Sequence, residues 1–122
     1  MSAIDWAEYP SFKSAEFRCR HCGREQMQPA FLERLQSLRN EFGPMVITSG
    51  WRCPEHPVEK AKAHPGMHST GMAADVAVQG ADAVRLLRLA LQMGFTGIGV
   101  QQKGAGRFIH LDLRAVPAIW SY

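Results

Sequence analysis

The sequence lacks a long apolar run, and this absence excludes a helix that crosses a membrane. No stretch of the 122 residues is hydrophobic over the length that a bilayer requires. Residues 1–10 also lack the basic start and the apolar segment of an export signal. We therefore expect a soluble chain that is cytoplasmic at synthesis, without a signal peptide and without a membrane partner.

A strong excess of charge of one sign is missing as well. The formal net charge is +3 at pH 7, and the lysines and arginines are spread along the chain. Since nucleic-acid binding usually requires a concentrated basic patch, no nucleic-acid partner is expected. Repeats and low-complexity tracts are also absent, and 122 residues with 46% hydrophobic content suit one domain, residues 1–122, in a monomer.

What the chain does contain is a regular pattern of apolar segments. Leucines at three-four spacing predict a helix over 28–43. A stripe at Val84, Leu87 and Leu91, widened by Leu86 and Met93, predicts another over 80–94. Strands are predicted at 45–48, 73–78, 95–100 and 108–113, with 116–122 as a closing segment. Strands joined by hairpins, with both helices on one side, define an α+β domain with a small, mainly antiparallel sheet.

Two of these strands carry side chains that bind metal ions. Asp75 lies on a strand face otherwise lined by alanines, shortly after His68, and His110 shares a strand face with Asp112. Two histidines and a carboxylate are typical ligands of a catalytic zinc ion, because three protein ligands leave one coordination position for water. The alternative is a pair of ordinary amphipathic strands whose polar faces meet solvent.

The cysteines form a second candidate metal site. Cys19 and Cys22 make a C-x2-C pair, and Cys53 with His56 makes a C-x2-H pair. Four such ligands are typical of a closed structural zinc site, and His21 is a further candidate for the fourth position. The alternative is three metal-free thiols in a reducing cytosol.

Arg52 is a candidate substrate-binding residue. It follows Gly50 at the end of a predicted strand, where a glycine lets the backbone approach a ligand closely. An arginine at such a place can pair with a carboxylate through two hydrogen bonds. A surface ion pair would explain Arg52 equally well. The polar, proline-containing loop over 54–67 then leads to His68 and is expected to border its site.

Three of these segments occur in a distinctive order. Residues 47–56 are followed by the spacing from His68 to Asp75, and then by residues 108–112 around His110. In this order they resemble the zinc D-Ala-D-Ala carboxypeptidases and phage peptidoglycan endopeptidases of the hedgehog/DD-peptidase superfamily. The similarity covers nearly the whole chain, and the ordered set of motifs is far more specific than any one of them.

The resemblance implies an α+β fold and one catalytic zinc ion held by His68, Asp75 and His110. It also implies that Arg52 contacts the substrate carboxylate or the oxyanion of the reaction. The implied activity is cleavage of peptide bonds that involve D-amino acids in peptidoglycan peptides.

The chain departs from the family pattern at the general base. Many members place a carboxylate or a histidine just before the last zinc ligand, where this chain has Arg107 and Phe108. Asp112 follows His110 on the same strand face, so it is a candidate catalytic base or a group that orients a ligand. Alternatively, Asp112 has no role in the reaction and only occupies the solvent-facing side of an edge strand. The base would then be His56 or His64 of the 54–67 loop.

The function expected from the sequence is therefore that of a zinc metallopeptidase acting on the cell wall. Short members without a signal peptide are similar to phage or prophage lysis proteins, which reach the wall through a separate membrane-permeabilising partner. The alternative is a catalytically silent, zinc-containing wall-binding or virion assembly module, because the usual base is missing.

Overall fold

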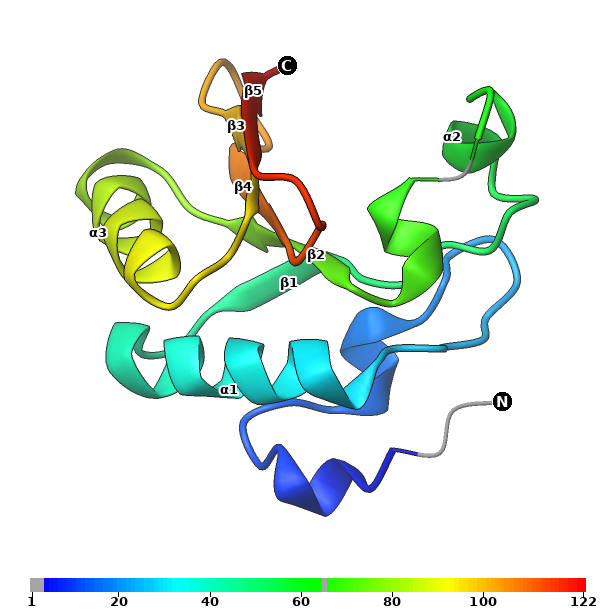
Figure 1. The fold of residues 1–122 in the computed structure, drawn as a ribbon, viewed down its shortest axis with the longest axis horizontal. Coiled ribbons are helices and arrows are strands. Elements are labelled where there is room, and N and C mark those ends of the chain that lie inside the picture. The colour runs from blue at the N-terminus through cyan, green and yellow to red at the C-terminus, as the bar shows by residue number, and fades with distance from the viewer. Residues whose placement is uncertain (1–3, 65) are drawn as a thin grey trace.

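A five-stranded sheet in the order β1-β2-β4-β3-β5 forms the centre of the computed structural model, which describes residues 4–64 and 66–122 (Figure 1). The strands are β1 (Val46–Ser49), β2 (Ala73–Ala77), β3 (Gly97–Gln101), β4 (Phe108–Asp112) and β5 (Ala118–Ser121). The helices are α1 (Pro29–Phe42), α2 (Pro57–Lys60) and α3 (Gly80–Gln92), with short 3-10 turns η1 (Trp6–Glu8), η2 (Ser14–Phe17) and η3 (Met67–Thr70). Three of the four strand pairings are antiparallel, which confirms the predicted α+β class with a mainly antiparallel sheet.

Helix α1 forms where the sequence predicts it. Pro29 occupies its first turn, where a missing backbone N–H costs nothing, and Gly43 ends it with a positive φ of 101°. Its buried face consists mainly of large apolar side chains, which are Phe31, Leu32, Leu35, Leu38 and Phe42.

Helix α3 begins at the predicted residue, and its buried face agrees in part with the predicted one. Its buried residues are Ala83, Leu86 and Ala90. Of the expected stripe, Leu86 is buried and Leu87 and Met93 pack half-buried against the core, whereas Val84 and Leu91 are more than half exposed, so the prediction was wrong at those two positions. The helix contacts α1 and β4 closely, and small alanines at the contact allow this approach.

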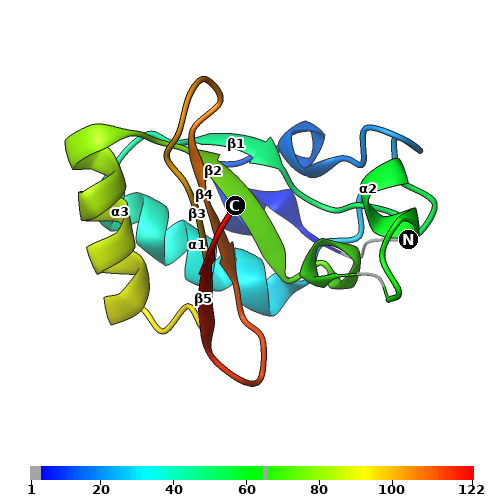
Figure 2. The same cartoon turned by 90° about the horizontal axis from the view of Figure 1, so that it is seen from above.

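The two faces of the central strands differ in chemistry. Ala74 and Val76 of β2 and Ile109 and Leu111 of β4 belong to one buried apolar cluster that also contains residues of α1 and α3. The alternate positions point to the opposite face, as the period of two requires, and they include the polar residues Asp75, His110 and Asp112. Figure 2 shows α3 on one side of the sheet and α2 on the other.

The C-terminal segment is a fifth strand rather than a mere closing segment. Strand β5 pairs in parallel with β3, and this pairing sets Trp120 opposite Gly99. Its four residues follow Pro117 and are too few for alternation to reveal a strand in the sequence. β5 therefore extends the polar face of the sheet with an aromatic side chain.

The chain before α1 has little regular structure, as expected, and packs through aromatic rings. The ring centroids of Trp6 and Phe17 are 5.5 Å apart, and those of Phe12 and Phe17 are also 5.5 Å apart.

No helix in the described part of the chain has the length and apolar character needed to cross a membrane. The first three residues, on which the expectation about an export signal partly rests, lie outside the described residues.

Candidate metal centre

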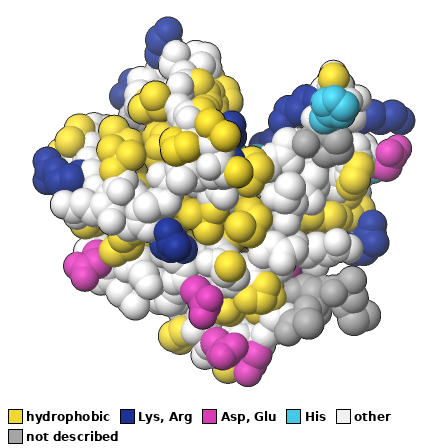
Figure 3. Space-filling view, viewed as in Figure 1, with side chains coloured by type: hydrophobic (Ala, Val, Ile, Leu, Met, Phe, Trp, Pro, Cys, Tyr) yellow, Lys and Arg dark blue, Asp and Glu magenta, His cyan; other side chains and the backbone are white. Residues whose placement is uncertain are grey.

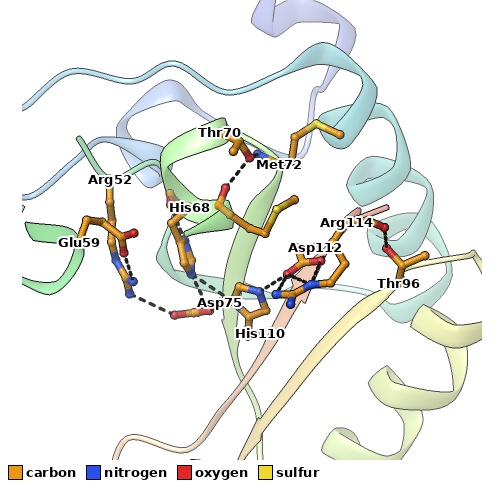
Figure 4. Close-up of polar contacts among 12 residues, drawn as sticks. Arg52, Glu59, His68, Thr70, Met72, Asp75, Thr96, His110, Asp112 and Arg114 are labelled. Atoms are coloured by element: carbon orange, nitrogen blue, oxygen red, sulfur yellow. Dashed lines mark hydrogen bonds and ion pairs between the residues drawn. The ribbon is translucent and has the colours of Figure 1, made fainter. Parts of the chain in front are cut away.

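Three buried side chains from three elements converge on the polar face of the sheet (Figure 4). His68 Nε2 lies 3.2 Å from Asp75 Oδ1 and 3.1 Å from His110 Nδ1, and His110 Nδ1 lies 3.0 Å from the same Asp75 oxygen. The sheet register produces half of this arrangement, because Asp75 of β2 lies directly opposite His110 of β4. Turn η3 adds His68. The structure therefore brings together the three residues that the sequence singled out as metal ligands.

The outer nitrogens of both imidazoles have hydrogen-bond acceptors of their own. His68 Nδ1 donates to the Gly50 carbonyl oxygen at 2.7 Å, and His110 Nε2 donates to Asp112 Oδ2 at 2.7 Å. With protons on these outer nitrogens, the inner nitrogens of the neutral rings present lone pairs. Two nitrogen lone pairs and a carboxylate oxygen then face one another, which is an arrangement that a cation stabilises.

The donor set fits zinc. Two imidazole nitrogens and one carboxylate oxygen are ligands of catalytic zinc sites, which keep one further position open. Among the described residues, the cluster of metal-binding side chains at this place has only these three members. A fourth position would therefore be free for water or substrate.

The electrostatics of the site keep Asp75 ionised. Burial alone would raise the pKa of Asp75, but the adjacent imidazoles of His110 and His68 hold it well below its usual range. Burial alone would lower the pKa of His110, yet its hydrogen bond to Asp112 and the adjacent Asp75 carboxylate outweigh burial and raise the pKa. The carboxylate is thus available as an anionic ligand at neutral pH.

Asp112 lies behind His110 and has no exposed surface. One of its oxygens accepts from His110, and Arg114 donates to both oxygens, with Nη2 at 2.6 Å from Oδ2 and Nε at 3.0 Å from Oδ1. The Arg114 guanidinium in turn stacks over Trp120, 4.4 Å from the ring centroid. Burial would raise the pKa of Asp112, but the bonds from His110 and Arg114 lower it.

Only a glycine at position 97 leaves room for this carboxylate. Gly97 lies opposite Asp112 in the β3–β4 register, and a Cβ atom on it would come within 1.9 Å of Asp112 Oδ1. The Asp112 carboxylate cannot easily move away from such an overlap, because it is buried and held by hydrogen bonds from His110 and Arg114. The sequence pattern did not reveal why residue 97 is a glycine, and the position of Asp112 explains it.

Arg52 reaches the metal centre from the segment after β1. Its Nη2 lies 3.6 Å from Asp75 Oδ2, and its Nη1 lies 3.1 Å from Glu59 Oε2. Its side chain is only 18% exposed, so its pairing with Glu59 is not an ordinary surface ion pair. A register shift between β1 and β2 after Ile47 directs the chain toward this place.

Glu59 holds Arg52 and is a residue that sequence reasoning missed. Its carboxylate, which has 1% of its surface exposed, also accepts from Lys62 Nζ at 3.1 Å and from the Gly66 N–H at 2.6 Å. Burial would raise the pKa of Glu59, but these donors lower it to about 2. Glu59 belongs to a four-residue helix in a polar loop, so no periodicity in the sequence marks it as buried.

A cavity of about 510 Å³ opens beside the metal centre. Figure 3 shows the molecule hollowed between the part that carries β3–β5 and the part that carries α2. Basic and aromatic side chains dominate its lining, which includes Arg52, Lys62, Arg114, Phe108, Trp120 and Tyr122. The cavity therefore suits a peptide-sized ligand with acidic groups.

The described lining of this cavity offers no carboxylate or imidazole beyond the three candidate metal ligands. Its carboxylate is Asp75, and its imidazoles are those of His68 and His110. Phe108 lines the cavity with an apolar ring, while Arg107, just before β4, lines a separate pocket beside α3. Neither position that carries the base in many family members supplies one here.

The three cysteines also come together, at a separate place. The sulfur atoms of Cys19, Cys22 and Cys53 all lie within 4.8 Å of one another. His21 Nδ1 lies 3.5 Å from Cys53 Sγ, whereas His56 Nδ1 accepts the Val58 N–H at 3.1 Å.

Fold and site together define the class of small α+β zinc peptidases. The family model for peptidase M15 matches residues 10–112, and the chain belongs to this family. A search of curated proteins found no match. Membership confirms the resemblance inferred from the order of the motifs, and it makes the protein a member of a zinc metallopeptidase superfamily.

Proposed function

We propose that the protein is a zinc-dependent peptidoglycan peptidase, of the D-Ala-D-Ala carboxypeptidase or the endopeptidase type. The observation that carries this proposal is the convergence of His68 Nε2, Asp75 Oδ1 and His110 Nδ1 beside an open cavity. A zinc ion held by these atoms would activate water and polarise the scissile carbonyl group. Membership in the peptidase M15 family supports hydrolysis of a peptide bond as the reaction.

Arg52 is the residue that we assign to the substrate. Its guanidinium lies at the edge of the metal centre and is held there by Glu59, so it is preorganised before a ligand arrives. From this position it can donate to a substrate carboxylate or to the oxyanion that develops on the carbonyl oxygen. Lys62 and Arg114 add positive charge to the same cavity, which favours peptides with free carboxylates.

Asp112 is assigned to orienting His110 rather than to proton transfer. It is fully buried, it is not part of the cavity lining, and both of its oxygens are bonded. Its bond to His110 Nε2 holds the proton there and leaves Nδ1 free for the metal. Asp112 therefore acts through His110 and is a positioning residue.

A second function is supported by one specific observation. The described lining of the cavity holds no carboxylate or imidazole beyond the three proposed metal ligands. A protein that keeps the zinc but lacks a base would serve as a wall-binding or virion assembly module. Such a module would bind peptidoglycan without cleaving it.

The proposed setting follows from the resemblance alone. A peptidoglycan peptidase acts on the cell wall, and a monomeric, phage-encoded lysis protein would reach it through a partner that permeabilises the membrane.

Digestion of purified peptidoglycan separates the two functions. The wild type is expected to release peptides or D-alanine, which mass spectrometry identifies together with the bond cleaved. His68→Ala should abolish release, and Arg52→Ala should lower kcat/KM while bound zinc stays unchanged. Arg88→Ala, which alters an exposed arginine of α3 outside the cavity lining, is the matched control for Arg52→Ala. Bound zinc without any released fragment, across several peptidoglycan types, would support the silent module instead.

A further inference from the structure

The three cysteines meet at a place that the proposed peptidase reaction does not use. Cys19 and Cys53 are buried and Cys22 is exposed, and all three are free thiols. Their sulfur atoms lie within 4.8 Å of one another, although Cys53 is far from the other two in the sequence. Thiolates bound to zinc at about 2.3 Å in a tetrahedron are about 3.8 Å apart, so a small movement would close the cluster around an ion.

Cys19 and Cys22 belong to a tight turn that brings their sulfur atoms together. The Cys19 N–H donates to the Arg24 carbonyl oxygen at 2.7 Å, and the Gly23 N–H donates to the Cys19 carbonyl oxygen at 2.8 Å. Gly23 has a positive φ of 76°, which completes the turn. This turn places the two cysteines of the C-x2-C pair on the same side, as a metal-binding loop requires.

Backbone N–H groups fix the position of the Cys19 sulfur atom. Its Sγ accepts two of them, from His21 at 3.4 Å and from Cys53 at 3.3 Å. The second of these bonds ties the C-x2-C turn directly to the segment that carries Cys53.

Two histidines are candidates for the fourth ligand, and their contacts differ. His56 Nδ1 accepts the Val58 N–H and caps α2, so the proton of the neutral ring lies on Nε2. His21 Nδ1 lies 3.5 Å from Cys53 Sγ, with an exposed ring that is free to adjust. The edge of a zinc tetrahedron between nitrogen and sulfur is also about 3.5 Å. These contacts favour His21 over His56.

We propose that Cys19, Cys22 and Cys53 hold a structural zinc ion, with His21 as the fourth ligand. A site with four protein ligands has no open position, so its role is to stabilise the fold. This inference rests on the sulfur cluster and is independent of the proposed peptidase activity.

The proposed ion would fix the segment that builds the catalytic side of the molecule. Cys53 follows Arg52 directly, and the Arg52 N–H donates to the His68 carbonyl oxygen at 3.2 Å. Two residues earlier, Gly50 packs so closely on Phe17 that a Cβ atom would come within 2.5 Å of the Phe17 Cα. The contact between Phe17 and Gly50 lies just before Cys19 in one segment and just before Cys53 in the other. An ion that joins these cysteines would therefore hold the two segments together and keep Arg52 in place.

Cobalt substitution distinguishes the two metal sites by their ligands. Only a site with thiolates gives Co(II) a strong sulfur-to-metal charge-transfer absorption in the near ultraviolet, and the His68, Asp75 and His110 site has none. The reconstituted wild type should show this absorption. The double variant His68→Ala/His110→Ala should keep it in full, and Cys22→Ser should reduce it strongly. A wild type without the absorption would overturn the proposal, whatever the peptidase assay shows.

Zinc content gives a second, independent test. The wild type should contain about two zinc ions per chain, and both Cys22→Ser and the double histidine variant should contain about one, because each removes a single site. In the native wild type, iodoacetamide should leave exposed Cys22 unmodified until a chelator is added. Immediate modification of Cys22 in the zinc-loaded protein would contradict a bound thiolate.

The fourth ligand is tested by comparing histidine variants. His21→Ala should lose the thiol-site zinc to a chelator faster than the wild type, while His56→Ala and the control His64→Ala should retain it. Loss from His56→Ala with retention in His21→Ala would overturn the assignment of His21. The cobalt absorption of each variant identifies which of the two sites released the metal.

Discussion

At the scale of single residues, the two histidines of the metal centre present different nitrogens to it. His68 offers Nε2 because its Nδ1 donates to Gly50, and His110 offers Nδ1 because its Nε2 donates to Asp112. Each hydrogen bond selects a tautomer, and the tautomer decides which nitrogen can bind a metal. The residues behind the ligands therefore matter as much as the ligands themselves.

Asp112→Asn tests this role directly. The amide can donate to His110 Nε2 and so favour the tautomer with a proton on Nδ1, which cannot bind metal. We expect zinc affinity to fall by roughly 10–100-fold and activity to return when zinc is supplied in excess. Chelator competition measures the affinity. A variant with normal zinc affinity whose activity falls by roughly 10²–10⁴-fold would instead identify Asp112 as the general base.

Residue types and spacing were enough to find His68, Asp75, His110 and Arg52. Strand alternation placed Asp75 and His110 on polar faces, and the structure sets them opposite each other. Glu59 could not be found in this way, because its burial depends on the loop that folds over it. The choice between base and positioning residue for Asp112 also depends on contacts with Arg114 and Gly97, which no spacing rule encodes.

At the scale of elements, β3 contributes two glycines that leave space on its polar face. Gly97 makes room for the Asp112 carboxylate, and Gly99 makes room for the Trp120 indole, which a Cβ atom would approach within 2.6 Å. In the sequence these glycines look like weak points of a strand. In the fold they allow β4 and β5 to place bulky polar and aromatic groups over β3.

Gly97→Ala should therefore displace the Asp112 carboxylate. Inserting a methyl group into this packed place is expected to cost about 1–3 kcal/mol of unfolding free energy and to weaken zinc binding. Urea denaturation with and without zinc measures both effects. In an Asp112→Ala background the same change should cost clearly less, because the clashing carboxylate is gone. An equal cost in both backgrounds would show that Asp112 is not the group displaced.

Helix α2 contributes Glu59, whose folded pKa lies well below its ordinary value. A carboxylate with a depressed pKa stabilises the fold at neutral pH, and this stability is lost as pH falls from the ordinary value of 4.5 toward about 2. The unfolding free energy of the wild type should therefore exceed that of Glu59→Gln near pH 7. The difference should shrink progressively below about pH 5.

Denaturant unfolding at several pH values measures this difference. Glu55→Gln, which changes an exposed carboxylate paired only with Lys60 across 3.6 Å, is the matched control. A constant gap between wild type and Glu59→Gln across the acidic range would show that Glu59 does not stabilise the fold through its charge.

The elements themselves were largely predictable, with informative exceptions. Apolar spacing and the stops at Pro29 and Gly43 located α1, and alternation located β2 and β4. Strand β5 was missed because four residues after a proline carry too little pattern. The buried face of α3 was predicted correctly at Leu86 but wrongly at Val84 and Leu91, because the packed face uses the small alanines Ala83 and Ala90 instead.

At the scale of the whole molecule, one short segment connects both proposed metal centres. Gly50 accepts the hydrogen bond that orients His68, Arg52 reaches Asp75, and Cys53 joins the sulfur cluster. The cavity beside the His68, Asp75 and His110 site lies between this segment with α2 on one side and β4 and β5 on the other. The order of motifs in the sequence revealed the family, whereas this spatial connection appears only in the fold.

Anomalous diffraction at the zinc edge, on crystals of the zinc-loaded protein, tests the central claim most directly. A peak is predicted about 2.0–2.2 Å from His68 Nε2, His110 Nδ1 and an Asp75 oxygen. A second peak among the cysteines would bear only on the structural site. The absence of a peak between His68, Asp75 and His110, or a peak bound to His110 Nε2 instead of Nδ1, would contradict the proposed metal centre.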